Sequence, residues 1–162
     1  MKNSKKIFLS IIIIGVVVLG LAWMSPASPP TLKDAWAHLD GLEAQVYKSP
    51  NCGCCDNYIG YLKRYGIEVE RIVTDEMDEI KDKYGVPYDH SSCHTMTIGG
   101  YVVEGHMPLE AVSKLLKEKP SIMGIGLQGM PSGSPGMPGV KNSDFAVYSI
   151  LEGGEIGSYL NL

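Results

Sequence analysis

Three of the four cysteines of this 162-residue chain, Cys52, Cys54 and Cys55, lie within four consecutive positions. A short apolar stretch at residues 44–47 predicts a strand before them, and apolar residues at helical spacing over residues 58–65 predict a helix after them. The cysteines are therefore expected at a turn from a strand into a helix. At such a turn, backbone N–H groups and the positive end of the helix dipole stabilise thiolates.

The rest of the chain predicts a mixed α/β domain. Hydrophobic periodicity, with glycine and proline as breakers, indicates further elements in this order: a short helix at 33–42, a strand at 67–73, a helix at 76–84, a hairpin of 95–98 with 101–104, a helix at 108–119 and a C-terminal β-hairpin of 146–151 with 156–160. This order matches a thioredoxin-like layout, in which helices flank a mixed sheet.

Residues 121–145 are predicted to form a long loop, because glycine and proline are too frequent there for a regular element. Met123, Met130 and Met137 recur in it every seven residues. The first two are expected to pack the loop onto the domain, since methionine fills irregular gaps. Met137 stands among glycines that would let the backbone approach a site closely.

The start of the chain is typical of a targeting segment. Three lysines and no acidic residue precede an apolar run at residues 7–24, which predicts a signal peptide or an N-terminal membrane anchor over residues 1–24. Residues 25–43 are expected to be a linker and a short helix, and residues 44–162 the folded domain. Cytoplasmic lysines would place that domain outside the cytoplasm, in the periplasm or on the outer face of the cell membrane.

The charge of the chain argues against a nucleic-acid partner. Its 14 basic and 18 acidic residues give a net charge of -4, whereas a nucleic-acid binder usually carries a basic field. Placement outside the cytoplasm permits disulfides. The oxidation state of the four cysteines is therefore open.

Four cysteines exceed what disulfide exchange needs, which is one attacking and one resolving sulfur. Cys93 is the fourth. Thiolates favour Cu(I), Zn(II) or iron–sulfur clusters, and closely spaced sulfurs can bridge neighbouring ions. The cysteine pattern therefore predicts a metal site, with a multinuclear Cu(I)–thiolate centre as the first interpretation.

Nitrogen and thioether donors accompany the fourth cysteine. His94 follows Cys93, and pairing of the predicted hairpin can bring both to the end of the sheet that holds His106 and Met107. Imidazole and thioether widen the selection towards copper. The candidate metal ligands are Cys52, Cys54, Cys55, Cys93, His94, His106, Met107 and Met137.

Three other interpretations of the cysteines stay open. They can form two structural disulfides, or a structural zinc site with four ligands and no redox change. They can also serve a thiol–disulfide oxidoreductase that uses Cys52 and Cys55. In thioredoxin-like enzymes a cis-proline usually faces the cysteine pair, and here Thr95 stands where that proline is expected, which weakens the enzyme interpretation.

Four separated motifs of the chain resemble the exported copper-resistance protein CopG family, long catalogued as a metal-binding domain of unknown function. In chain order they are Tyr47-Lys48-Ser49-Pro50-Asn51-Cys52-Gly53-Cys54-Cys55, Ser92-Cys93-His94-Thr95, Gly100-Tyr101-Val102-Val103-Glu104-Gly105-His106 and Gly129-Met130-Pro131-Ser132-Gly133-Ser134-Pro135-Gly136-Met137. The resemblance covers roughly residues 44–160.

This resemblance implies a thioredoxin-like fold and a cysteine-bridged cluster of several copper ions. It also implies a role in copper handling, which allows cycling between Cu(I) and Cu(II), so that a copper oxidoreductase is the enzymatic option and a binding role is expected ahead of it. The expected partners are copper ions, copper-efflux or copper-carrier proteins, and the membrane through the N-terminal segment.

Overall fold

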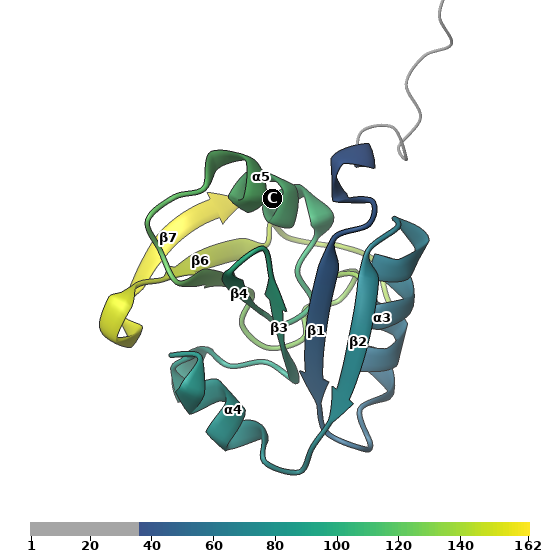
Figure 1. The fold of residues 1–162 in the computed structure, drawn as a ribbon, viewed down its shortest axis with the longest axis horizontal. Helices are drawn as coiled ribbons and strands as arrows, with labels where there is room; N and C mark the ends of the chain where they lie inside the picture. Colours follow the sequence, from purple (N-terminus) through teal and green to yellow (C-terminus); the bar gives the residue numbers. More distant parts are fainter. Residues whose placement is uncertain (1–35) are drawn as a thin grey trace, which may run out of the picture. The chain divides into compact units, whose positions relative to one another are not determined.

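The computed structural model describes residues 36–162, shown in colour in Figure 1. Seven strands form one sheet in the order β2-β1-β3-β4-β5-β6-β7. The strands are β1 (Glu43–Lys48), β2 (Glu68–Val73), β3 (His94–Ile98), β4 (Tyr101–Glu104), β5 (Gly124–Gly126), β6 (Ala146–Ile150) and β7 (Ile156–Asn161). The helices are α3 (Gly53–Arg64), α4 (Met77–Lys83) and α5 (Leu109–Glu118), and single 3-10 turns are Ala37–Leu39, Tyr88–His90 and Glu152–Gly154.

Strand pairing makes the sheet mixed. β1 pairs with β2 in parallel and with β3 antiparallel, and β3 and β4 form an antiparallel hairpin. β4 and β5 are parallel, whereas β6 and β7 form an antiparallel C-terminal hairpin. The predicted mixed α/β sheet with flanking helices and a closing hairpin is therefore confirmed.

Helices α3 and α5 cover one face of the sheet and enclose the main core. The apolar positions of both helices recur at helical spacing, so each presents one apolar stripe to the strands. The buried side chains that meet there include Tyr58, Ile59 and Leu62 from α3, Leu109, Val112 and Leu115 from α5, and Val46, Met96, Val103 and Ile125 from the sheet. This packing fixes the first turn of α3 against the ends of β1 and β3.

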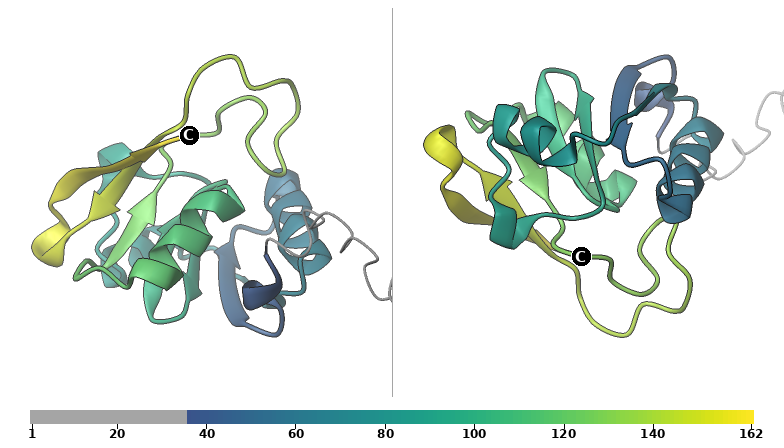
Figure 2. Two further views of the ribbon diagram at one scale, coloured as in Figure 1. Left: turned by 90° about the horizontal axis from the view of Figure 1, so that it is seen from above. Right: turned by 90° about the horizontal axis from the view of Figure 1, so that it is seen from below.

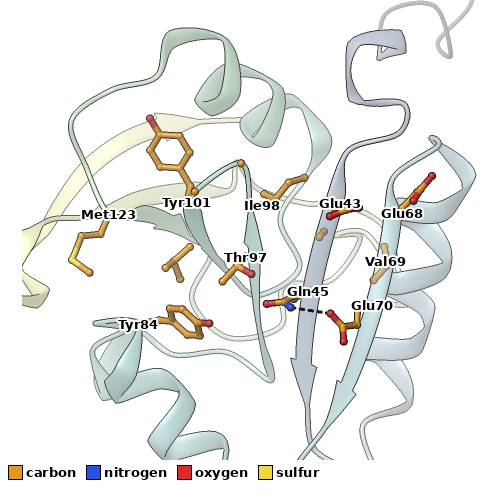
Figure 3. A pocket seen from close by; sticks show the side chains of 14 residues that line it. Glu43, Gln45, Glu68, Val69, Glu70, Tyr84, Thr97, Ile98, Tyr101 and Met123 are labelled. Atoms are coloured by element: carbon orange, nitrogen blue, oxygen red, sulfur yellow. Dashed lines mark hydrogen bonds between the residues drawn. The ribbon is translucent and has the colours of Figure 1, made fainter.

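Helix α4 lies on the opposite face, where the hydroxyl groups of Tyr47 on β1 and Tyr84 at the end of α4 are 3.0 Å apart. Beside α4 this face is open, and a hollow of about 930 Å³ is lined there by residues of β1–β4. Figure 3 shows Glu70 in this hollow, where its carboxylate accepts a hydrogen bond of 2.8 Å from Gln45. Polar groups thus line part of this second face, which also carries a smaller core cluster of Val86, Val102, Tyr148 and Ile150.

Strand β5 corrects the prediction that all of residues 121–145 form a loop. Two glycines flank the fully buried Ile125, and their lack of a side chain permits close approach to the neighbouring strands. A Cβ at Gly124 would lie 2.0 Å from the carbonyl oxygen of Val102, and one at Gly126 would lie 2.1 Å from the ring of Tyr148. The glycines that suggested a loop are those that let β5 fit between β4 and β6.

The predictions for the start of the chain fall mainly outside the described residues. This holds for the targeting segment at 1–24, for the linker and for the first residues of the short helix at 33–42. The described part of that helix forms only the 3-10 turn Ala37–Leu39, so the prediction of a longer helix is wrong there. Between residues 36 and 162, no helix combines the length and the apolar character that crossing a membrane requires.

Two glycine substitutions test this packing. Gly60 lies inside α3, and a Cβ added there would meet no atom within 4 Å, so Gly60→Ala is expected to raise the free energy of unfolding by about 0.5–1 kcal/mol. Gly124→Ala must push β4 from β5 and is expected to lower it by about 1–3 kcal/mol. Urea denaturation of both variants measures the two effects. An unchanged midpoint for Gly124→Ala would contradict the close approach of these strands.

Candidate metal centre

The cysteine motif forms the first turn of α3. Cys52 is the residue immediately before the helix, and Cys54 and Cys55 lie in its first turn. An ion pair ties this turn to the sheet, because the ammonium of Lys48 at the end of β1 lies 3.0 Å from the carboxylate of Asp56. Lys48 is only 1% exposed. The predicted strand-to-helix turn is therefore the observed position of the three cysteines.

The β3–β4 hairpin brings the second group of donors to the same place. Cys93 directly precedes β3, His94 is the first residue of β3, and His106 follows the end of β4. The backbone N–H of Gly105 donates to the carbonyl of His94 at 3.0 Å, which closes this end of the hairpin. Pairing therefore brings the two histidines together as predicted, with ring centroids 4.8 Å apart.

The donor atoms form two groups that share one sulfur. The sulfurs of Cys52, Cys54, Cys55 and Cys93 all lie within 4.8 Å of one another, as do the donor atoms of Cys93, His94 and His106. The sulfur of Cys54 is 3.5 Å from that of Cys52 and 3.8 Å from that of Cys93. Nε2 of His106 is 3.1 Å from the Cys93 sulfur. Six of the eight predicted ligands are thus brought together.

Two of the four sulfurs are bonded to each other in this structure. Cys52 and Cys55 form a disulfide with a Cα–Cα distance of 5.4 Å, while Cys54 and Cys93 are free thiols. The alternative of two structural disulfides is therefore wrong for this state, whereas the alternative redox pair is the bonded one. A site with four thiolates requires that this disulfide is first reduced.

Burial keeps the Cys93 thiol and the two imidazoles neutral before a metal binds. It raises the pKa of the Cys93 thiol to about 12, and the neighbouring Cys54 adds to this rise. Burial also lowers the pKa of His94 well below its usual value, helped by the nearby His106 and Lys81, and lowers the pKa of His106. Both imidazoles are therefore in the neutral form that binds metals.

The long loop reaches the N-terminal part of α3, which carries the cysteines, and Figure 2 shows the loop beside this helix. The carbonyl of Pro135 is 2.7 Å from Nδ1 of His106, so Nδ1 carries the proton and Nε2 keeps its lone pair towards Cys93. At Gly136, a Cβ would lie 2.7 Å from the backbone nitrogen of Tyr58. The loop thus approaches α3 closely, as its glycines indicated, and orients one imidazole.

The methionines separate into different surroundings. Met107 is fully buried in the main core with Met96, and Met137, next to Gly136, is partly buried; a thioether contribution from Met107 or Met137 stays a prediction. Met123 packs against the smaller core cluster as expected. Met130 is 53% exposed, so the prediction that it packs the loop onto the domain is wrong.

Sequence reasoning missed the residues that support the donors. Tyr58 was visible only as a core position, but its ring centroid lies 4.6 Å from that of His94 and its hydroxyl donates to the carbonyl of Met107 at 3.1 Å. The Pro135 carbonyl has no sequence signal at all, because any residue offers one. For Lys48 the sequence offered only a weak signal of a structural role, namely a charged residue at the end of an apolar stretch.

Counting free thiols tests the disulfide. Alkylation of the metal-free protein in denaturant, without reductant, is expected to add two groups per chain, at Cys54 and Cys93, and four after reduction. Cys52→Ser is expected to take up three groups without reductant, because it frees Cys55. Intact-protein mass spectrometry gives the count. Four groups on the unreduced wild type would contradict the Cys52–Cys55 bond.

Comparison with known proteins places this centre in a family. Residues 90–137 match a family model described as a protein of unknown function, DUF411, and none of the curated proteins matches significantly. Two solved structures, titled "Copper resistance protein copG", Form 2 and Form 1, are each 35% identical to the chain with a TM-score of 0.69. They cover 76% of this chain, which spans 99% and 98% of theirs. The chain therefore belongs to the CopG family of copper resistance proteins.

Proposed function

We propose that this protein binds Cu(I) as its cargo, several ions per chain, and acts in copper resistance outside the cytoplasm. Its family and its cysteine cluster are compatible with copper binding. The soft sulfur donors favour Cu(I), and the neutral imidazoles suit copper as well. Binding and handling of the ion are the activity, rather than catalysis on another substrate.

The sharing of Cys93 between two donor groups carries the proposal. One group holds four sulfurs, and the other adds two imidazoles beside the same Cys93 sulfur. A single tetrahedral zinc ion uses only four ligands, so six convergent donors exceed one structural zinc site. A thiolate common to both groups suits ions that it bridges, which supports a multinuclear copper centre over zinc.

Copper loading requires electrons as well as ions. Reduction of the Cys52–Cys55 disulfide takes two electrons and two protons, which an external thiol reductant supplies, and yields two thiols. These thiols lose their protons when they bind the metal. Cycling between Cu(I) and Cu(II) at the same donors is the further part of the proposal, since imidazole nitrogen suits both oxidation states better than sulfur alone.

The start of the chain supports the proposed location and partners. The lysine-flanked apolar segment at residues 1–24 supports export or anchoring in the membrane. A protein placed there would exchange copper with efflux or carrier proteins. Loss of export after the three lysines are replaced by glutamate would support this part of the proposal.

Anaerobic titration of the reduced protein tests the copper site. Wild-type protein is expected to bind several Cu(I) ions per chain against a competing chelator. Cys93→Ser is expected to bind fewer ions and to weaken the remaining sites at least about 10-fold, because it removes the sulfur that both donor groups share. Metal analysis gives the stoichiometry, and X-ray absorption at the copper edge gives the ligand atoms.

A matched pair of histidine variants controls that titration. His106→Asn removes an imidazole of the centre, and His38→Asn removes one that hydrogen-bonds to Ser113, away from the cysteines. Only His106→Asn should reduce the nitrogen contribution around copper. Full copper loading of Cys93→Ser would count against the shared site.

A second candidate function is thiol–disulfide exchange. The disulfide at the N-terminus of α3 favours it, since that position stabilises a thiolate. In such a reaction one sulfur of the reduced pair attacks a substrate disulfide, and the other resolves the mixed disulfide. The electron pair passes to the substrate, and the Cys52–Cys55 bond forms again.

Insulin reduction separates the two functions. We expect neither the metal-free wild type nor Cys54→Ser to accelerate the reduction of insulin by dithiothreitol, because both have Thr95 where thioredoxin-like enzymes usually carry a proline. In the wild type the free Cys54 sulfur, 3.5 Å from that of Cys52, also competes for it. Turbidity of precipitating insulin chains measures the rate. Acceleration that survives Cys54→Ser, without bound metal, would rank the oxidoreductase first.

A further inference from the structure

A buried carboxylate lies behind the metal centre and has no place in the proposed function so far. Glu104, at the end of β4, is 0% exposed. Its Oε1 accepts hydrogen bonds from the ammonium of Lys81 at 2.5 Å and from the backbone N–H of Ser92 at 2.6 Å. Its Oε2 accepts one from the hydroxyl of Thr95 at 2.6 Å. Three donors, one from α4 and two from residues 92–95, therefore converge on one side chain.

Two of these donors enclose the ligands of the centre. Ser92 directly precedes Cys93, and Thr95 directly follows His94. The carboxylate thus holds both ends of the two-residue segment that supplies a sulfur and an imidazole. Charge-assisted hydrogen bonds are about twice as strong as neutral ones, so this segment is fixed more firmly than strand pairing alone would fix it.

The same residue connects this segment to His106. Glu104 pairs with Thr95 across the hairpin and is followed by Gly105, which donates its N–H to the carbonyl of His94. His106 comes next in the chain. The position of the Cys93–His94 segment relative to His106 is therefore set around one carboxylate.

Lys81 supplies the charge that lets the carboxylate stay buried. It reaches Glu104 from α4, on the face of the sheet opposite to α3, and also donates to the hydroxyl of Thr95 at 3.2 Å. A buried ion pair contributes little to stability, because desolvation offsets the attraction, and apolar residues often replace it without loss. The buried Lys81–Glu104 pair is therefore explained by the segment that it holds in place rather than by its own contribution to stability.

We propose that Glu104, together with Lys81 and Thr95, is a positioning residue of the copper centre, which fixes the Cys93 sulfur and the His94 imidazole for the metal. This inference rests on the proposed function. Groups that orient metal ligands through hydrogen bonds are typically worth about 10- to 100-fold in metal affinity. Glu104 acts through its neighbours and does not bind copper itself.

A pair of variants at Thr95 tests the inference with little change in shape. Thr95→Val keeps the branched side chain and removes the hydroxyl, whereas Thr95→Ser keeps the hydroxyl. In the anaerobic Cu(I) titration of the reduced full chain, Thr95→Val is expected to weaken binding about 10-fold, with a smaller imidazole signal in X-ray absorption. Thr95→Ser is expected to bind as the wild type does. Glu104→Gln should weaken binding as well, and Glu68→Gln, an exposed carboxylate on β2, should not.

Two controls separate the inference from other causes. Ile150→Ala opens a cavity on β6, in the smaller core cluster. It serves as a control that lowers the stability of the protein, as Thr95→Val can, but leaves the hydrogen bonds of Glu104 in place. If it weakens copper binding as much as Thr95→Val at an equal loss in Tm, the role of Glu104 is merely structural and the inference fails. It also fails if Thr95→Ser behaves like Thr95→Val, or if both Thr95→Val and Glu104→Gln bind like the wild type. A wild type that binds no Cu(I) would instead overturn the proposed function.

Discussion

Strand β3 is the element on which the whole centre depends, because it pairs with β1 on one side and with β4 on the other. The first pairing sets His94 opposite Lys48, just before the cysteine turn, and the second sets Thr95 opposite Glu104. No single local segment holds enough donors for the centre. A slip of one residue in either pairing would turn every side chain of β3 to the wrong face.

The alternation of side chains along β3 divides the centre into two layers. His94 faces α3, where its ring packs on Tyr58, and Thr95 faces α4, where it meets Lys81 and Glu104. The His94 ring thus lies on the side of the main core, and the hydrogen bonds that hold its strand through Thr95 lie on the side of α4. This arrangement explains why a charged pair is buried in a strand region that apolar residues would otherwise fill.

Most of the fold could be predicted from sequence because its elements are bounded by local signals. Gly99-Gly100 indicated the hairpin of β3 and β4, and Gly66 and Pro120 indicated the ends of α3 and α5. Strand β5 could not be predicted, since its glycines are favourable only once Val102 and Tyr148 lie against them. The same limit applies to the centre. The donors could be found by residue type, but Pro135, Glu104 and Lys81 act through long-range contacts that no local pattern encodes.

The disulfide and the proposed metal compete for the same atoms. Cys52 and Cys55 cannot be bonded to each other and also bind copper as thiolates, so oxidation removes two of the four sulfurs while Cys54 and Cys93 stay free. A ligand that binds only one of two states shifts the equilibrium towards that state. Copper that binds the dithiol therefore favours the reduced pair, and disulfide formation favours release. Under the proposed function, the affinity of this centre for copper is thus set as much by the supply of reductant as by the donors that the fold brings together.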